Sequence, residues 1–596
     1  MRCAVLCLAL FLSPAVLAER ATLQTLGERS GYHQTGRYQE VLDLCKAFLD
    51  AYPGKVRCLT FGTTAEGRPM AALAASADGV LWGPAARAKG RPVILVQAGI
   101  HPGEIEGKDA GFLVLRELLD GKAAPGFLDK ATLVFVPVYN VDGHEQMSPH
   151  HRPNQRGPRE MGFRATAQNL NLNRDYVKAD APETRAMLGL LEEWDPVLYV
   201  DLHATDGAKF EHDVAILASP ETGRADGLDQ VATSLTTKLA DRVSRMGHLP
   251  LTFYPAFRKP GDPRSGIALE DAPPRFSTGY WAARNRLALL VETHSWRPYA
   301  YRVKTTRDVL AALFDQALVD LPGWRTAIDA AEKRSLAGQD VVLLSAVSET
   351  SRTIDFRGYA YKVVPSEISG KDWFVFDESK PQVWQLPFFD QYAPVLTVRA
   401  PAAGGGYLIP AAHAEDVAAR LALHGISSRR IPALRKPLDV WAFRIDRVVR
   451  RELFEGRYRG QFLGKWRKEP QPIPPGSLFV PIDQPRARLL MQMLEPQAPD
   501  SLSAWGFFDA HLEQKEYMED YLVEAEARRM LASDKRLAAE FQAKLADPAF
   551  ANDPAARLEF FYRLTPSFEQ ETTLVPVLKV DREPSSAGRR APASAR

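Results

Sequence analysis

The stretch VILVQAGIHPGEIEGKDA, residues 93–110, starts as an unbroken apolar run and then turns polar. A continuous run of β-branched and aliphatic residues is typical of a strand buried on both faces of a parallel sheet. His101 and Glu104 follow the run directly. Such a pair can bind one metal ion, but it is also common in exposed loops. The stretch therefore predicts a buried strand, and the rest of the sequence must decide whether it also carries a metal site.

The first half of the chain contains three more runs of this kind: ATLVFVPVYN (131–140), DPVLYVDLHA (195–204) and RLALLVETHS (286–295). Helical patterns lie between the runs, over residues 108–121 and 183–194. Strands that alternate with helices are the mark of an α/β fold. We therefore expect an α/β protein with a mixed, mostly parallel sheet flanked by helices, followed by a mixed α+β accessory region.

Each predicted strand ends in polar residues, and ligand sites in such sheets lie beyond the carboxyl ends of the strands. After the second run come Asn140 and Asp142, while the third ends in Asp201 and His203 and the fourth in Glu292 and His294. Alone, each residue has an ordinary interpretation as solvated surface, a hydrogen-bonded histidine or an arginine's partner. Their shared position at strand ends favours a common site.

A catalytic zinc site has three protein ligands from nitrogen and oxygen donors, and a fourth position open to water. His101 and Glu104 can converge on one ion, and His203 can complete the set. Glu292 would then be free to take a proton from water.

With these residues assembled, the chain resembles the zinc carboxypeptidase family over roughly residues 40–300. HPGE is similar to the family's HxxE motif, YVDLHA to the strand with the last ligand, LLVETHS to the strand with the general base, and NLNRDY to an Asn-Arg pair. The resemblance implies a metallocarboxypeptidase with one Zn²⁺ held by His101, Glu104 and His203. It also implies Glu292 as general base, and Asn173 and Arg174 as ligands of the substrate's terminal carboxylate.

Three positions depart from the family pattern. Asn171 stands where the family usually has an aspartate that supports the first zinc histidine, so we expect this support to be weaker or to come from elsewhere. Asp175 follows the Asn-Arg pair where asparagine is common, which adds negative charge near Arg174. Pro102 and Gly103, inside the HxxE motif, replace the arginine of the digestive members.

Two further roles in the family have more than one candidate residue in this chain. We expect Arg164 to polarise the scissile carbonyl, with Arg152 and Arg156 as alternatives in the same irregular segment; each is explained equally well as a solvated arginine. Tyr254 and Tyr280 are the candidates for the tyrosine that closes over the substrate, and the sequence does not choose between them.

The expected substrate is a peptide with a free C-terminal carboxylate, from which one residue is removed. One alternative is a zinc amidase that acts on N-acyl amino acids or cell-wall peptides, because these also present a carboxylate. A second alternative is a non-catalytic binding protein on the same scaffold. The presence of His101, Glu104, His203 and Glu292 together disfavours it.

The 596 residues exceed the usual size of one hydrophobic core. We expect a signal peptide over residues 1–18, a catalytic domain over 19–335, an accessory region of unknown role over 340–580 and a disordered tail over 581–596. The accessory region should contain short strands, a linker at 468–477 and helices within 510–550. The alternatives to a cleaved signal peptide at residues 1–18 are a membrane anchor or a lipid-modified cysteine.

The predicted signal peptide implies an exported protein, periplasmic or secreted. Beyond it only Cys45 and Cys58 remain, and they could pair in an oxidising compartment. A net charge of +2 and an apolar fraction of 45% are those of a soluble globular chain. We therefore expect no nucleic-acid partner and no stable membrane insertion. The oligomeric state stays open.

Overall fold

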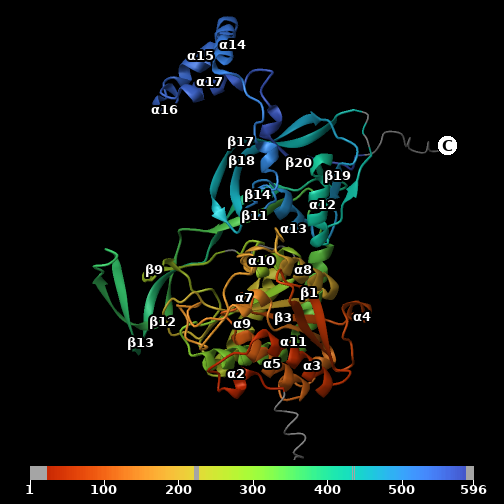
Figure 1. Ribbon diagram of the computed structural model, residues 1–596, viewed down its shortest axis with the longest axis vertical. Helices are drawn as coiled ribbons and strands as arrows, with labels where there is room; N and C mark the ends of the chain where they lie inside the picture. Colours follow the sequence, from red (N-terminus) through yellow and green to blue (C-terminus); the bar gives the residue numbers. More distant parts are fainter. Residues whose placement is uncertain (1–22, 221–226, 271, 433, 435, 585–596) are drawn as a thin grey trace, which may run out of the picture.

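The structure is a computed structural model that describes residues 23–584, except 221–226, 271, 433 and 435. The predicted signal peptide (1–18) and most of the predicted tail (585–596) lie outside the described residues. Figure 1 shows an α/β body that carries a sheet-rich region and, beyond that, a group of short helices.

The body is built on an eight-stranded mixed sheet with the order β1-β2-β4-β3-β5-β10-β6-β7. The strand bounds are β1 Val56–Thr63, β2 Pro69–Ala75, β3 Val93–Ala98, β4 Thr132–Val136, β5 Leu198–Ala204, β6 Val214–Ser219, β7 Pro250–Leu251 and β10 Leu287–Thr293. The four strands expected from the sequence are β3, β4, β5 and β10, and they are adjacent and parallel in the centre of the sheet. The predicted fold class is confirmed.

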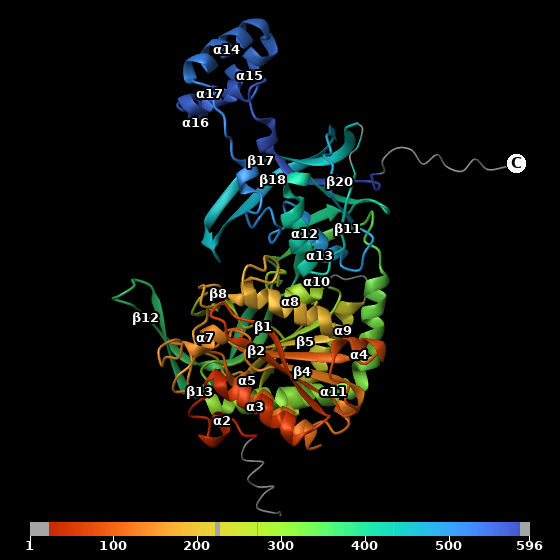
Figure 2. The same cartoon turned by 45° about the vertical axis from the view of Figure 1, so that its right-hand side comes forward.

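Helices cover both faces of this sheet. Figure 2 shows α8 and α10 above the sheet and α5 and α11 below it. The bounds of the helices in the body are α2 Leu26–Arg29, α3 Tyr38–Ala51, α4 Gly83–Ala88, α5 Glu106–Leu119, α6 Phe127–Lys130, α7 Val141–Glu145, α8 Pro182–Trp194, α9 Leu228–Arg245, α10 Ser277–Ala283 and α11 Tyr299–Lys333. Both predicted helices, α5 and α8, are present. Gly107 lets α5 approach the sheet closely, since a Cβ there would lie 2.8 Å from the Cβ atoms of Ala98 and Leu202.

The central strands are buried along nearly their whole length, which explains their continuous apolar sequence. In β3, β4 and β5 every residue is buried, because helices pack on both sides. The polar residues begin where these strands end. The carboxyl edge of the sheet therefore collects the side chains that the site requires.

The C-terminal region contains a six-stranded sheet with the order β16-β19-β15-β20-β17-β18. Its strands are β15 Gly406–Ile409, β16 Arg429–Arg430, β17 Leu438–Phe454, β18 Arg457–Gln471, β19 Leu478–Pro481 and β20 Leu574–Val580. A separate pair is formed by β11 Asp340–Val347 and β14 Tyr392–Arg399. The helices are α12 Ala414–Leu423, α13 Ala487–Leu494, α14 Asp520–Ser533, α15 Lys535–Lys544, α16 Pro548–Ala551 and α17 Pro554–Tyr562. Of these, α12 contacts α8, and α13 contacts α10.

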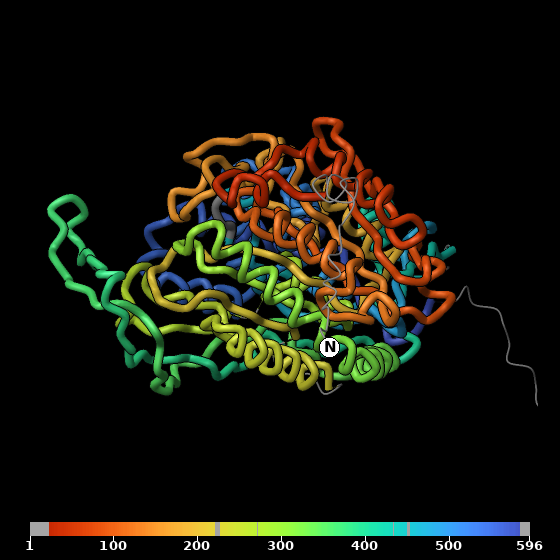
Figure 3. The backbone as a smooth tube through the Cα atoms, turned by 90° about the horizontal axis from the view of Figure 1, so that it is seen from below, coloured from red at the N-terminus to blue at the C-terminus, as the bar shows by residue number. Residues whose placement is uncertain are grey.

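Two features of this region differ from the sequence expectations. Instead of short strands, residues 352–389 form a long two-stranded ribbon of β12 Arg352–Pro365 and β13 Asp372–Phe389. This ribbon stands away from the body in Figure 3. It joins β8 Phe257–Lys259 and β9 Asp262–Ala268 of the body in one sheet. The expected linker at 468–477 is in part strand, because β18 continues to Gln471.

A disulfide joins Cys45 of α3 to Cys58 of β1, with 5.5 Å between the Cα atoms. It fixes the first long helix to the edge of the sheet. In the portion of the chain that the structure describes, no helix combines the length and the apolar character needed to cross a membrane.

Candidate metal centre and substrate clamp

The structure brings His101, Glu104 and His203 together at the carboxyl edge of the sheet. His101 and Glu104 lie in the tight turn between β3 and α5, where the Glu104 amide donates to the His101 carbonyl (2.8 Å). His203 is near the end of β5. All three side chains are buried, and one potential ligand atom from each lies within 4.8 Å of the others. The three residues can therefore share one ion.

Asn171 decides which nitrogen of His101 faces this centre. Its Oδ1 accepts a hydrogen bond from the Asn173 amide (2.9 Å) and lies 3.0 Å from His101 Nε2. Because Oδ1 is the acceptor, Nε2 carries the proton and Nδ1 presents its lone pair to the centre. The asparagine therefore supports His101 as the expected aspartate would, but without a charge.

His203 lies between two carboxylates. Its Nδ1 is 2.9 Å from Glu104 Oε2, and its Nε2 is 2.9 Å from Asp201 Oδ2. Burial opposes a charge on the ring, but Asp201 and Glu104 raise the pKa of His203 well above its usual value. Asp201 is itself held by Gln97 (2.8 Å). Asp201 is thus the residue that orients the second histidine, and its position two residues before His203 on the same strand was a signal that the sequence contained.

Glu104 is buried and ionised. Burial acts against its charge, but Arg152, His101 and His203 hold the pKa of this carboxyl well below its usual range. Arg152 Nη2 lies 2.8 Å from Glu104 Oε1. Gly103 makes this approach possible, because a Cβ there would lie 2.4 Å from Arg152 Cγ. The glycine of HPGE therefore gives the arginine access to the carboxylate beside it.

The donor set fits a zinc ion. Burial lowers the pKa of His101 to about 4, so the ring is neutral at pH 7 and can act as a ligand. Its Nδ1 is buried, has no hydrogen-bond partner, and lies 3.1 Å from Glu104 Oε1. A lone pair facing a carboxylate oxygen is unfavourable unless a cation lies beside both. Two imidazole nitrogens and one carboxylate are a common catalytic zinc set.

Glu292 lies next to this centre on β10, directly opposite His203 in the parallel pairing with β5. Its Oε2 is buried and has no hydrogen-bond partner. Burial, with the nearby carboxylates Glu104 and Asp201, raises the pKa of Glu292 to about 8, against the opposing effect of His203. A carboxyl group with such a pKa and an unsatisfied oxygen is suited to proton transfer.

Asn173 and Arg174 lie on the short helical turn Leu172–Arg174. Asn173 Oδ1 accepts from the Ser277 amide (2.9 Å), which leaves its amide nitrogen as the end that can donate to a ligand. The Arg174 guanidinium lies 4.0 Å from the centre of the Phe276 ring and donates to the Asn173 carbonyl (2.7 Å). Among the described residues no carboxylate lies within ion-pair distance of Arg174, although Glu455 acts on it electrostatically, so its N–H groups are open to an anion.

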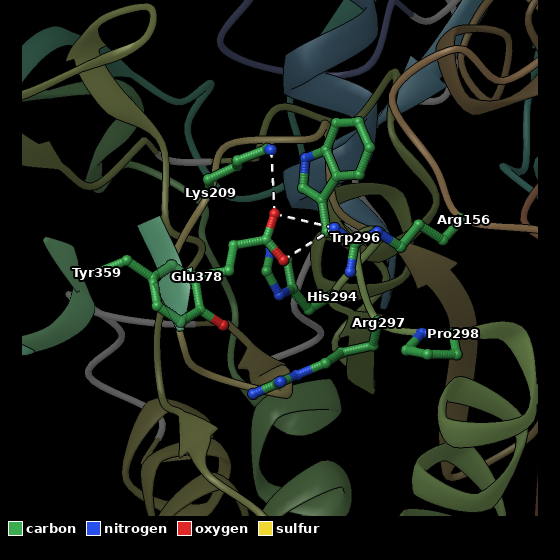
Figure 4. Close-up of a pocket in the computed structure, with 8 residues that line it drawn as sticks. All are labelled: Arg156, Lys209, His294, Trp296, Arg297, Pro298, Tyr359 and Glu378. Atoms are coloured by element: carbon green, nitrogen blue, oxygen red, sulfur yellow. Dashed lines mark hydrogen bonds and ion pairs between the residues drawn. The ribbon is translucent and has the colours of Figure 1, made fainter. Parts of the chain in front are cut away.

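The three candidate arginines occupy different positions. Arg152 and Arg164 both reach Glu104, at 2.8 Å and 3.4 Å, and the Arg164 side chain is the more exposed at 41%. Arg156 instead pairs with Glu378 of β13 (2.8 Å). Figure 4 shows Arg156 and Lys209 converging on Glu378 beside Trp296, in a pocket next to His294. Arg152 and Arg164 thus lie at the centre, and Arg156 belongs to the neighbouring pocket.

The two candidate tyrosines are also separated. Tyr280 is buried in α10 and contacts His424 of the accessory region (3.0 Å). Tyr254 lies close enough to Glu292 for that carboxylate to raise its pKa, although burial is the larger cause. It also interacts electrostatically with Arg174. Of the two candidates, Tyr254 is therefore the one that lies near Glu292 and Arg174, and its loop position between β7 and β8 gave no pattern that could reveal this.

The acidic residues near the motifs have varied surroundings. Asp175 is buried and pairs with Lys178, and it accepts from the Ala181 amide (2.9 Å). Its charge is therefore neutralised by a lysine three residues away. Glu211 pairs with Arg357 (2.9 Å), and Asp213 pairs with Arg297 (2.9 Å). Asp206 is exposed and lies near enough to Glu292 to raise its pKa.

The fold and this site suit a metal-dependent hydrolase, and comparisons with known proteins show what the chain resembles. Residues 41–256 match the family described as zinc carboxypeptidase. A curated relative, carboxypeptidase 2 of Trichophyton rubrum, is 24% identical over 439 residues, which cover 69% of this chain and 73% of the relative. Residues 41–256 of the chain therefore match a zinc carboxypeptidase domain, and these similarities support a metallocarboxypeptidase. The matched residues include His101, Glu104, Asn173, Arg174 and His203.

Solved structures with similarity to the chain include carboxypeptidase A of Helicoverpa armigera, at 16% identity and a TM-score of 0.36, covering 54% of this chain and 81% of that one. A metallo-carboxypeptidase of Pseudomonas aeruginosa, solved with (2-guanidinoethylmercapto)succinic acid, has 18% identity and a TM-score of 0.35. It covers 48% of this chain and 69% of that one.

Proposed function

We propose that the protein removes single residues from the C-termini of peptides, with one Zn²⁺ held by His101, Glu104 and His203 and with Glu292 as general base. The observation that carries this proposal is the availability of the Arg174 guanidinium, which has no ion-pair partner among the described residues. The guanidinium acts electrostatically on Arg164, which lies 3.4 Å from Glu104 of the metal centre, and the buried Glu292 oxygen beside that centre has no hydrogen-bond partner.

The substrate would be held by its terminal carboxylate. Arg174 offers two parallel N–H groups to a carboxylate, which lysine cannot do, and the Asn173 amide adds a donor. The Phe276 ring, whose centre lies 4.0 Å from the guanidinium, attracts the cation and covers one side of it. A carboxylate fixed there directs the last peptide bond of the substrate toward the three ligands.

A zinc ion in such a site polarises the scissile carbonyl and acidifies water. Glu292 accepts a proton from the attacking water at its unpartnered oxygen and then passes it to the leaving amine. The raised pKa of Glu292 describes the site without an ion, and a nearby cation lowers it, so that the carboxylate is the resting form. Arg152 and Arg164 provide positive charge near the developing oxyanion. The carbonyl-polarising role that we expected for Arg164 is therefore open to Arg152 as well.

The experiment compares three substrates with the zinc-loaded protein: a peptide with a free C-terminus, its C-terminally amidated form, and N-acyl amino acids or cell-wall peptides. We expect single residues to be released from the free peptide and little reaction with the amidated one. Hydrolysis of only the acyl amino acids or cell-wall peptides would replace the proposal with the amidase function.

We also propose that the protein is exported to the periplasm or secreted. The signal-like residues 1–18 support this location, and so does the disulfide between Cys45 and Cys58, because disulfides persist in oxidising compartments. Sequencing the N-terminus of the mature protein tests it. A chain that retains residues 1–18 in the cytoplasm would contradict it.

A further inference from the structure

The tip of the β17–β18 hairpin touches the segment that carries the substrate clamp. The Glu455 carboxylate accepts a hydrogen bond from the Asn171 amide at 2.8 Å, across 284 residues of sequence. Glu455 takes a φ of +51°, which is uncommon for a residue with a side chain. Gly456 also takes a positive φ (+77°), and Phe454 pairs with Arg457, so Glu455 and Gly456 form a two-residue turn that requires this backbone conformation and fixes Glu455 at the hairpin tip.

The hairpin tip is anchored in this position by a second residue. Arg457 Nε and Nη2 donate to the two carboxylate oxygens of Asp180, at 2.8 and 2.9 Å. The Arg457 guanidinium also lies 4.0 Å from the centre of the Phe507 ring. A bidentate ion pair stacked on an aromatic ring fixes direction as well as distance. The tip therefore cannot shift freely over the segment below it.

The residue beneath Glu455 is connected to both halves of the site. Asn171 Oδ1 lies 3.0 Å from Nε2 of His101, the first metal ligand. The same oxygen accepts the amide hydrogen of Asn173, which belongs to the carboxylate clamp. A displacement of the Asn171 backbone would therefore move a ligand and the clamp together.

A second carboxylate of the accessory region supports the other side of the clamp. Asp500 accepts from the backbone amide of Arg275 (2.9 Å) and from its Nη1 (3.0 Å). The guanidinium groups of Arg275 and Arg174 lie 5.1 and 4.0 Å from the centre of the Phe276 ring. The clamp is thus held from two directions by residues outside the zinc carboxypeptidase match.

We propose that Glu455 is a positioning residue of the active site, through which the C-terminal region holds Asn171 and thereby sets His101 and Asn173. The proposal rests on the proposed function for its kinetic consequences, but not for its effect on metal binding. It gives the accessory region a role in catalysis, which its own sequence does not reveal.

Two substitutions distinguish the effect of the Glu455 side chain from that of its backbone conformation. Glu455→Gly suits the positive φ and keeps the turn, so it removes the hydrogen bond without destabilising the hairpin. Glu455→Gln keeps an acceptor oxygen. The matched control is Glu469→Ala, because Glu469 pairs with Arg444 at 2.8 Å in the same hairpin, away from the site.

Each variant, as the full chain, is measured for zinc affinity by chelator competition, for kcat and KM on a peptide with a free C-terminus, and for Tm. Mutation of a residue that hydrogen-bonds a metal ligand changes metal affinity by roughly 10- to 100-fold. For Glu455, which is one hydrogen bond further from the ligand, we expect a change of about 3- to 10-fold. In Glu455→Gly, zinc affinity should fall and KM should rise by this factor while Tm is maintained. Glu455→Gln should stay within about 2-fold of the wild type, and Glu469→Ala should not change.

The proposal is overturned if Glu455→Gly matches Glu469→Ala in both zinc affinity and KM. It is also overturned if Glu455→Gln is as impaired as Glu455→Gly, because the acceptor oxygen would then be irrelevant. If the wild type releases no C-terminal residues, the proposed function fails. The zinc affinities of the two Glu455 variants would still test the positioning role.

Discussion

Asn171 Oδ1 lies 3.0 Å from His101 Nε2, so a neutral amide occupies the place from which the family usually supports its first zinc histidine with a carboxylate. The geometry of that support is retained, and its charge is absent. An uncharged partner makes the imidazole a weaker base and therefore a weaker zinc ligand. This chain should consequently bind its ion less tightly than it would with aspartate.

Asn171→Asp should tighten zinc binding by about 10-fold, since the carboxylate increases the basicity of His101 and can still accept the Asn173 amide hydrogen. Asn171→Ala should weaken zinc binding by roughly 10- to 100-fold. Competition with a chromogenic chelator measures both. Equal affinities in all three proteins would show that His101 does not depend on this contact.

Arg174→Lys should raise KM by about 10-fold and Arg174→Ala by about 100-fold, with a smaller effect on kcat. The reason is that a charge-assisted pair contributes about 1.5–3 kcal/mol and lysine cannot form it bidentately. The kinetic constants are compared on free and amidated peptides. If Arg174→Ala retained the wild-type preference for the free carboxylate, another residue would be the clamp.

The stability of the protein should fall as the pH decreases below about 6.5. Burial lowers the pKa values of His144, His294 and His424 to about 3, whereas the same histidines in the unfolded chain titrate near 6.5. Between these values the unfolded state binds protons that the folded state cannot accept. Each of these histidines therefore lowers the free energy of unfolding by about 1.4 kcal/mol for each unit by which the pH falls.

His424→Gln tests this dependence, because His424 donates to the Val177 carbonyl (3.0 Å) and lies far from the metal centre in sequence. Between pH 6 and pH 4 the unfolding free energy should depend less steeply on pH in the variant, because unfolding then takes up about one proton fewer. An unchanged slope would show that His424 is charged in the folded protein or does not titrate in this range.

The sequence was most informative where residues obey a local rule. Continuous β-branched runs revealed β3, β4, β5 and β10, because burial on both faces requires them. Strand β2, which lies between β1 and β4 and has the sequence PMAALAA, lacks that composition and was not predicted. The long ribbon β12–β13 is mostly exposed, and its apolar runs, such as WFVF at 373–376, are too short to indicate its length. The residues of the metal centre could be predicted because they lie at the ends of these recognisable apolar runs.

Other parts of the site depend on contacts between distant segments. Glu455 meets Asn171, and Asp500 meets Arg275, through packing that no local pattern records. Arg152 and Arg164 lie in an irregular segment, and only their positions over Glu104 distinguish them from Arg156. Tyr254 is likewise distinguished from Tyr280 only by its neighbours in space.

The most direct test of the central claim is a comparison of the zinc-loaded wild type with Glu292→Gln, in which zinc content and release of the C-terminal residue are measured on the same samples. The wild type should release single residues and contain one zinc per chain. Glu292→Gln should lose at least about 100-fold in kcat, as expected for removal of a general base, and keep its zinc. Loss of the metal with the activity, or retention of the activity, would contradict the assignment of Glu292 as the base.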